Sequence, residues 1–203
     1  VLPALTLTGA LMATAKDDVT QVGALTVDTT STLTSTAGSI ALADVANDFK
    51  GAVMATAAAV GKSVTLADAN ALQLGAISVG NGALTVTAGG NITQSGAINK
   101  TGNGAASFTV TVPLNVSASV DASTQANNFG GGSVSFAVAG AGSIQDIGLR
   151  DTNAAPGTLT LPVASFRNLT LQYDNAALVL PALTLTGALM ATAKDDVTQV
   201  GAL

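Results

Sequence analysis

Residues 1–25 and residues 179–203 have the same sequence, VLPALTLTGALMATAKDDVTQVGAL, so the chain begins to repeat itself at Val179. Packing does not require such identity, because a buried Leu tolerates Ile or Met and an exposed Thr tolerates Ser at small cost. Identity at every position therefore indicates recent duplication of a longer segment. We expect the chain to be a window of a tandem array, or a piece that carries one repeat plus an overlap. Such arrays are structural or adhesive far more often than catalytic.

A weaker repeat lies inside the longer one. Residues 9–25 (GALMATAKDDVTQVGAL) align without gaps with residues 82–98 (GALTVTAGGNITQSGAI), and the third copy, at 187–203, follows after a longer interval. Two shorter segments also recur, ANDF at 46–49 as ANNF at 126–129 and DANA at 68–71 as DTNA at 151–154. A solenoid can gain or lose a coil and stay in register, whereas a sandwich domain keeps a constant size. The unequal halves therefore favour a solenoid.

Short alternating segments indicate half-buried strands, since apolar residues alternate there with polar or small ones. These segments are residues 5–8, 25–27, 40–42, 64–66, 72–74, 84–86 and 159–161. Turn signals separate them, namely the glycine-rich residues 80–82, 89–91, 102–104, 130–132 and 140–142. A coil of three such strands with short turns takes roughly 21–27 residues, which gives about 7–8 coils per repeat and an axial length on the order of 35 Å. The pattern predicts an all-β fold, a parallel β-helix or β-solenoid. We expect residues 1–203 to form one continuous segment, with one repeat at 1–178 and the start of the next at 179–203.

The composition agrees with a β-rich, non-globular chain. Charged residues make up 9% of the sequence, against about 25% in ordinary domains, and all twelve acidic residues are Asp. The absence of Glu beside many Thr and Val argues against exposed helices. The net charge of −5 and the scattered basic residues disfavour nucleic acid as a partner. No apolar run reaches the length of a membrane-spanning helix.

Three segments carry a family resemblance, NDFKGAV (47–53), VTLADANALQLG (64–75) and LTVTAGGNITQSG (84–96). They resemble large bacterial exoproteins of the filamentous-haemagglutinin type. The resemblance is clear over residues 46–98 and weaker over residues 126–203. It implies a right-handed parallel β-helix shaft, secretion from a Gram-negative cell to its surface, and a role in adhesion or matrix building. It carries over no catalytic residue.

The sequence predicts no catalytic, cofactor-binding or metal-binding residue. Most hydrolytic triads and zinc sites need His or Cys, and the chain has neither. The only adjacent carboxylates, Asp17-Asp18 and their duplicate Asp195-Asp196, are interpreted as turn residues, with a divalent-cation contact between filaments as the alternative. Residues 130–132 lack the Asp that a calcium-binding β-roll requires.

Several polar patterns have both a plain and a functional interpretation. Threonine pairs such as Thr85 and Thr87 suit an outward strand face, and ice binding is the alternative. Asn91, Asn115 and Asn168 begin glycosylation sequons, and turn positions are the plainer interpretation. A Lys–Asn cross-link would need a buried acid, and the lysines all lie near turn signals.

The predicted function is that of a non-enzymatic extracellular filament or shaft segment of a giant repetitive surface adhesin or matrix fibre. A self-assembling fibre or sheath subunit is the first alternative, and a β-helix carbohydrate-active enzyme is the second. The expected partners are neighbouring repeats, identical chains, and a host or matrix surface. Phe49 and Phe129 are expected to fill the interior. The two copies of the duplicated segment are expected to match in burial, at the pairs Leu5/Leu183, Leu7/Leu185, Leu11/Leu189, Val19/Val197 and Leu25/Leu203.

Overall fold

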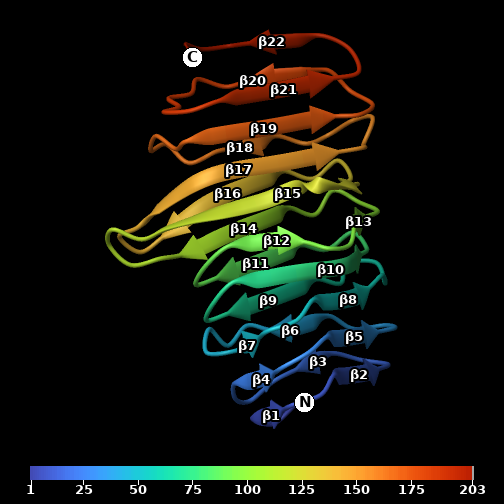
Figure 1. Ribbon diagram of the computed structural model, residues 1–203. Helices are drawn as coiled ribbons and strands as arrows, with labels where there is room; N and C mark the ends of the chain where they lie inside the picture. The colour runs from blue at the N-terminus through green and yellow to red at the C-terminus, as the bar shows by residue number, and fades with distance from the viewer. Residues whose placement is uncertain (203) are drawn as a thin grey trace.

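The computed structural model describes residues 1–202, which form a stack of parallel β-strands with no helix in that range (Figure 1). The strands of one sheet run in one direction across the front of the stack, and those of a second sheet return behind it. In Figure 1 the front strands point to the right and the rear strands point to the left while the chain rises from the N-terminus to the C-terminus, so the coils wind in a right-handed sense. The predicted all-β parallel solenoid is confirmed.

The longest sheet, called here the long sheet, has ten strands. Nine of them follow one another along the stack in the order β2 (Leu11–Ala15), β5 (Ser31–Ser35), β8 (Val53–Ala57), β10 (Leu72–Val79), β12 (Ile92–Gln94), β15 (Ser117–Asn127), β17 (Ser143–Asp151), β19 (Asn168–Tyr173) and β21 (Leu189–Ala193). The tenth strand, β13 (Ile98–Lys100), also pairs with β10.

The return strands form the second sheet, which has seven members in the order β3 (Val19–Thr20), β6 (Ile40–Leu42), β9 (Val64–Asp68), β11 (Leu84–Ala88), β14 (Ala106–Thr111), β16 (Val134–Ala139) and β18 (Leu159–Thr160). Two small sheets complete the coils at the ends. One contains β1 (Leu5–Leu7), β4 (Leu25–Val27) and β7 (Asp48–Phe49), and the other contains β20 (Leu178–Leu180) and β22 (Val197–Gln199).

The strand register shows that the coils differ in length. Leu72 pairs with Ile92, which closes a short coil, whereas Ile92 pairs with Val120, which closes a much longer one. The expected range of roughly 21–27 residues per coil is slightly too narrow at both limits. Eight pairings along the long sheet lead from β2 to β21, the strands that begin at Leu11 and at its duplicate Leu189. Eight coils at ~4.8 Å span about 38 Å, close to the expected length of one repeat.

Small apolar side chains fill the interior, because alternate residues of each strand point inward. The burial pattern of β11, buried at every second position, is typical. The larger rings gather in the middle coils, where Phe108 stacks on Phe136 with ring centroids 5.5 Å apart and meets Phe129 edge-on at 6.1 Å. Phe129 and Phe49 are 0% and 2% exposed, so both rings fill the interior as predicted.

A column of glycines marks one corner of the coils, where the chain enters the strands of the second sheet. A Cβ atom on Gly104 would collide with the carbonyl oxygen of Gly82, and one on Gly132 would collide with that of Gly104. Gly157 meets Gly132 in the same way. The glycine-rich turn signals of the sequence therefore reflect a close approach of stacked backbones.

The two copies of the duplicated segment occupy opposite ends of the stack, and they match in burial at only two of the pairs compared. Leu5, Leu7, Leu183 and Leu185 are all half-buried, so these two pairs match.

The prediction is wrong at the next two pairs. Leu11 is buried and Leu189 is half-buried, while Val19 is 4% exposed and Val197 is 45% exposed. The physical reason is that the first copy is covered by the following coil, through β5 and β6, whereas the last copy rests on the preceding coil, through β19. Leu203, the counterpart of Leu25, lies outside the described residues.

Candidate functional site

The most elaborate polar site lies inside the solenoid at one corner of the first coils. The side-chain amides of Gln21 and Asn47 bind each other reciprocally, with N–O distances of 2.8 and 3.0 Å. Asn47 Oδ1 also accepts the backbone N–H of Leu25 at 2.9 Å, and Asn47 Nδ2 donates to the carbonyl oxygen of Ala67 at 3.1 Å. Asn47 is fully buried, so these bonds satisfy an amide that water cannot reach.

A buried carboxylate extends this set of contacts by one more coil. Asp68, 3% exposed, accepts the backbone N–H of Phe49 at 2.7 Å and that of Asn70 at 2.6 Å. Burial raises the pKa of Asp68, and the two N–H donors act in the opposite direction. Gln21, Asn47 and Asp68 thus connect three successive coils, and we call them the first corner ladder.

A second corner ladder, formed by Gln94, Asn127 and Asp151, repeats this arrangement. Gln94 and Asn127 exchange the same two amide bonds at 2.8 and 3.0 Å, and Asn127 Oδ1 accepts the N–H of Ile98 at 2.8 Å. Asp151 accepts the N–H of Phe129 at 3.3 Å, and burial raises its pKa as well.

The local sequence explains why the two ladders match. In both halves, the Gln ends a short run that is followed by a Gly turn and by the strand residue whose N–H the Asn accepts. The Asn lies shortly before the buried Phe whose N–H the Asp accepts. The Gln and Asn lie 26 positions apart in the first half but 33 in the second. The strands between Gln94 and Asn127, above all β14 and β15, are longer than those between Gln21 and Asn47, so the ladder keeps its geometry while the coils change length.

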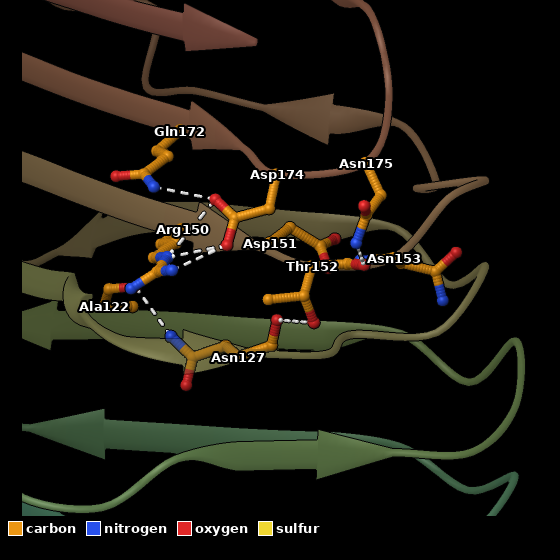
Figure 2. Close-up of polar contacts among 9 residues, drawn as sticks. All are labelled: Ala122, Asn127, Arg150, Asp151, Thr152, Asn153, Gln172, Asp174 and Asn175. Atoms are coloured by element: carbon orange, nitrogen blue, oxygen red, sulfur yellow. Dashed lines mark hydrogen bonds and ion pairs between the residues drawn. The ribbon is translucent and has the colours of Figure 1, made fainter. Parts of the chain in front are cut away.

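Figure 2 shows the region where the second ladder meets the next coil. Asn127 Nδ2 donates to the carbonyl oxygen of Ala122 at 2.8 Å, and the hydroxyl of Thr152 donates to the backbone oxygen of Asn127 at 2.9 Å. Asn175, one coil further, donates to the backbone oxygen of Thr152 at 2.8 Å. Side-chain bonds to backbone atoms thus continue through successive coils beside the strand pairing.

An ion pair lies next to the second ladder. The Arg150 guanidinium holds the Asp174 carboxylate through N–O contacts of 2.7 and 3.0 Å, and Gln172 donates to the same carboxylate at 2.7 Å (Figure 2). The Arg150 hydrogen bonds lower the pKa of Asp174. Two further ion pairs, Lys50–Asp28 and Arg167–Asp146, also join neighbouring coils. The basic residues that are scattered in the sequence therefore include three that connect adjacent coils.

Lys100 is the one lysine buried in the interior among the residues that the structure describes. It is 0% exposed, and its ammonium donates to the carbonyl oxygen of Gly82 at 2.6 Å. Burial lowers its pKa. The sequence interpretation placed every lysine near a turn and did not predict that the side chain of Lys100 is buried. Its position at the inward-pointing end of a short apolar alternation, Ile98-Asn99-Lys100, was the available signal.

The aspartate pairs singled out in the sequence lie where they were expected. Asp17-Asp18 and Asp195-Asp196 occupy the turns between β2 and β3 and between β21 and β22. Asp18 accepts the backbone N–H of Ser39 in the next coil at 2.7 Å. Among residues 1–202 there is no group of three or more Asp, Glu, His or Cys side chains that could hold a metal ion. A cation contact between filaments stays a prediction.

The other polar patterns also fall on coil surfaces. Asn91 and Asn168 accept backbone N–H groups of the next coil, from Ser119 and Ala188, both at 2.8 Å. Thr85 continues a column of hydroxyl residues on the second sheet, but the column through Thr87 is interrupted by Ala67. No helix within the described part of the chain is long and apolar enough to cross a membrane.

The ladder residues were visible in the sequence only as separate repeats. The two ANxF segments, the two Asp segments and the two aligned GAL segments were recognised, but nothing connected them. Their common order at intervals of about one coil was the signal that would have joined them. Chemically, the ladder is saturated with internal hydrogen bonds. It can hold three coils in register, and each member depends on the coil beside it.

A family model matches most of the chain, over residues 1–56, 61–134 and 167–203. The chain belongs to the DUF5649 family, which is described as repeats of unknown function. The matched segments of this DUF5649 chain contain both Gln–Asn pairs and both copies of the duplicated segment. No curated protein and no solved structure matches the chain.

Proposed function

We propose that this chain is a non-enzymatic structural segment, a shaft or filament element of a giant repetitive adhesin or matrix fibre on the surface of a Gram-negative bacterium. The solenoid fold and membership of a repeat family support a structural role. The resemblance of residues 46–98 to exoproteins of the filamentous-haemagglutinin type supports the extracellular location and the adhesive setting. The partners are neighbouring repeats or identical chains, and a host or matrix surface.

The observation that carries the proposal is the return of the sequence to the same sheet after whole coils. Leu11 begins β2 and its duplicate Leu189 begins β21, eight coils further along the long sheet. Each added repeat therefore lengthens the stack by about 38 Å without changing its sides. Stability in such an array is close to a sum of contributions from each coil and from its neighbours, so length can be set by repeat number.

The sides of the solenoid are suited to this role. Ion pairs such as Arg150–Asp174 connect one coil to the next, and the corner ladders connect three. These contacts recur along the axis and resist the separation of coils. They support a role in which the stack has to stay continuous.

A self-assembling subunit that joins end to end is a second candidate. The observation that favours it is the presence of strands at both ends of the long sheet, β2 and β21, each with one paired edge. A strand edge offers backbone donors and acceptors to another chain.

The proposal is tested by preparing chains with one, two and three copies of residues 1–178, each followed by residues 179–203. We expect small-angle X-ray scattering and electron microscopy to show rods that lengthen by about 38 Å per copy. Folded copies that behave as separate beads on a flexible chain would contradict the proposal. Labelling of intact cells with an antibody against the rod would test its surface location, and labelling only after lysis would contradict it.

A further inference from the structure

Three asparagines begin Asn-X-Ser/Thr sequons, and the structure distinguishes one of them from the other two. Asn91 accepts, through its side-chain oxygen, the backbone N–H of Ser119 in the next coil. Asn168 accepts the backbone N–H of Ala188 in the same way, and its side-chain nitrogen donates to Asp146 at 2.7 Å. Both of these side chains therefore hold neighbouring coils together.

The third sequon begins at Asn115, in the turn between β14 and β15, and its asparagine makes no such contact. Asn115 is exposed, and its side chain has no hydrogen-bond partner among residues 1–202. The backbone N–H of Val116 donates to the carbonyl oxygen of Pro113 at 3.1 Å and closes the turn. Asn115 has a φ of 63°, a conformation that Asn and Gly adopt more readily than other residues. The turn thus accounts for Asn115 but places no requirement on Ser117, which completes the sequon.

This turn lies at the outermost edge of the middle coils. Figure 1 shows the connection between β14 and β15 projecting to the left, beyond the coils below it. The apolar side chains on either side of Asn115 are also at the surface, since Leu114 is 68% exposed and Val116 is 44% exposed. Neighbouring apolar side chains at a projecting tip favour unwanted association. A bulky hydrophilic group on Asn115 would shield both of them.

We propose that Asn115 is a modification site, at which this chain carries an N-linked sugar. The sequon supplies an asparagine amide and a hydroxyl two residues later, and such sequences are modified in the surface loops of secreted proteins. The inference rests on the surface location given under the proposed function. Asn91 and Asn168 stay unmodified, because a sugar on either amide would crowd the coil to which that side chain is bonded.

The reaction is a transfer of a glycosyl group by a glycosyltransferase from a glycosyl diphosphate, whose diphosphate is linked to a nucleoside or to a lipid. The side-chain nitrogen of Asn115, which carries two N–H bonds, attacks the anomeric carbon of the sugar. A C–N bond forms and the C–O bond to the diphosphate breaks, so the bonding electrons leave with the diphosphate. The nitrogen gives up one proton to a base of the glycosyltransferase. No group is oxidised or reduced.

The structural reason is tested with purified, unmodified chain, a soluble asparagine glycosyltransferase and nucleotide-linked glucose. The folded chain is compared with three synthetic peptides, each centred on one of the sequons. We expect the peptides to react at similar rates, whereas the folded chain should react at Asn115 at least tenfold faster than at Asn91 or Asn168. Equal rates at the three asparagines of the folded chain would overturn the proposal.

Two variants separate the sequon from the turn. Asn115→Gly keeps a residue that adopts positive φ and removes the amide, whereas Ser117→Ala keeps the asparagine and removes the hydroxyl. Both should abolish the sugar in the cells that produce the protein, while the thermal unfolding midpoint of the unglycosylated chain stays that of the parent. Ser143→Ala, at the Cα partner of Ser117 in the next coil, is the matched control and should leave the sugar in place. A sugar that persists at Asn115 in the Ser117→Ala chain would contradict the proposal.

The deciding experiment is peptide mass spectrometry of the protein purified from the surface of the cells that produce it. We expect a sugar on most copies of the Asn115 peptide, and on the Asn91 and Asn168 peptides at least tenfold less often. A single sugar assigns the nucleotide-linked donor, and an oligosaccharide assigns the lipid-linked one. A bare Asn115 peptide in protein labelled at the surface of intact cells would overturn the inference and leave the proposed function standing. A glycosylated Asn115 in protein that never reaches the surface would contradict the proposed location and leave the site standing.

Discussion

The first and last coils of the molecule have the same sequence in two different surroundings. Both form the same internal bridges, between Leu2 and Gln21 and between Leu180 and Gln199. They differ in which side is covered. The first copy has its neighbour on the C-terminal side and buries Val19, whereas the last copy has its neighbour on the N-terminal side and leaves Val197 45% exposed.

This difference separates two levels of structure. The path of one coil is set by its own sequence, since the same residues give the same pairing at either end. Burial is set by the neighbouring coil, since the same valine is inside at one end and outside at the other. The contribution of a given residue to the stability of this fold therefore depends on its position in the stack as much as on its identity.

The largest effect is expected in the middle coils, which have neighbours on both sides. Phe129→Ala removes a fully buried ring that meets Phe108 and should lower the free energy of unfolding by roughly 3–5 kcal/mol. The half-exposed Val179 near the last coil supplies the control, and Val179→Ala should cost less than about 0.5 kcal/mol. Urea denaturation followed by circular dichroism measures both. Similar costs for the two variants would contradict the distinction between middle and end.

The next effect compares equivalent glutamines with and without a partner. Gln94→Ala leaves the buried amide of Asn127 without its reciprocal bonds and should cost about 2–3 kcal/mol. Gln199→Ala, in the last copy, should stay within about 0.5 kcal/mol. Thermal denaturation of the two variants beside the parent chain provides the comparison. A loss of stability from Gln199→Ala as large as that from Gln94→Ala would show that the buried asparagine partner is not what makes the glutamine stabilising.

A smaller effect comes from the valines that differ in burial. Val19→Ala removes two buried methyl groups and should destabilise the protein by about 1–2 kcal/mol, while Val197→Ala should cost less than about 0.5 kcal/mol. Hydrogen exchange of the backbone amides in β6 and β20, the strands paired with these valines, reports the local change. Faster exchange in β20 after Val197→Ala, equal to that in β6 after Val19→Ala, would contradict the account.

The smallest effect concerns pH and Lys100. Burial lowers the pKa of Lys100 in the folded protein below its ordinary value of 10.5. The unfolded chain therefore binds more protons in the window between the two values, and stability should rise as the pH rises toward 10.5. Lys100→Met should remove this rise while keeping the side-chain volume. Urea midpoints at neutral and alkaline pH measure it, and parallel curves for the two proteins would refute the assignment.

The sequence predicted the fold well because the solenoid is a local structure. The alternation at residues 84–86 and the turn at residues 89–91 determine one coil, and the next coil repeats the same rule. The buried rings of Phe49 and Phe129 followed from the scarcity of large side chains in the interior. The Asp pairs followed from their position between strands.

The corner ladders and the unequal burial of the two copies could not be predicted in the same way. The ladders join Gln21 to Asn47 and Gln94 to Asn127 at spacings of 26 and 33 positions, and those spacings depend on how long each coil is. The burial of Val19 and Val197 depends on which coil lies next to each. Both require the register between coils, which alternation within a strand does not specify.

The account's central claim is that a neighbouring coil, not the local sequence, determines the environment of the duplicated segment. Its most direct test is the thiol-labelling rate of a Val197→Cys chain, with and without a copy of residues 26–57 appended after residue 203. The account predicts that Cys labelling in the extended chain falls to the slow rate of a Val19→Cys chain. A labelling rate unchanged by the added coil would contradict it.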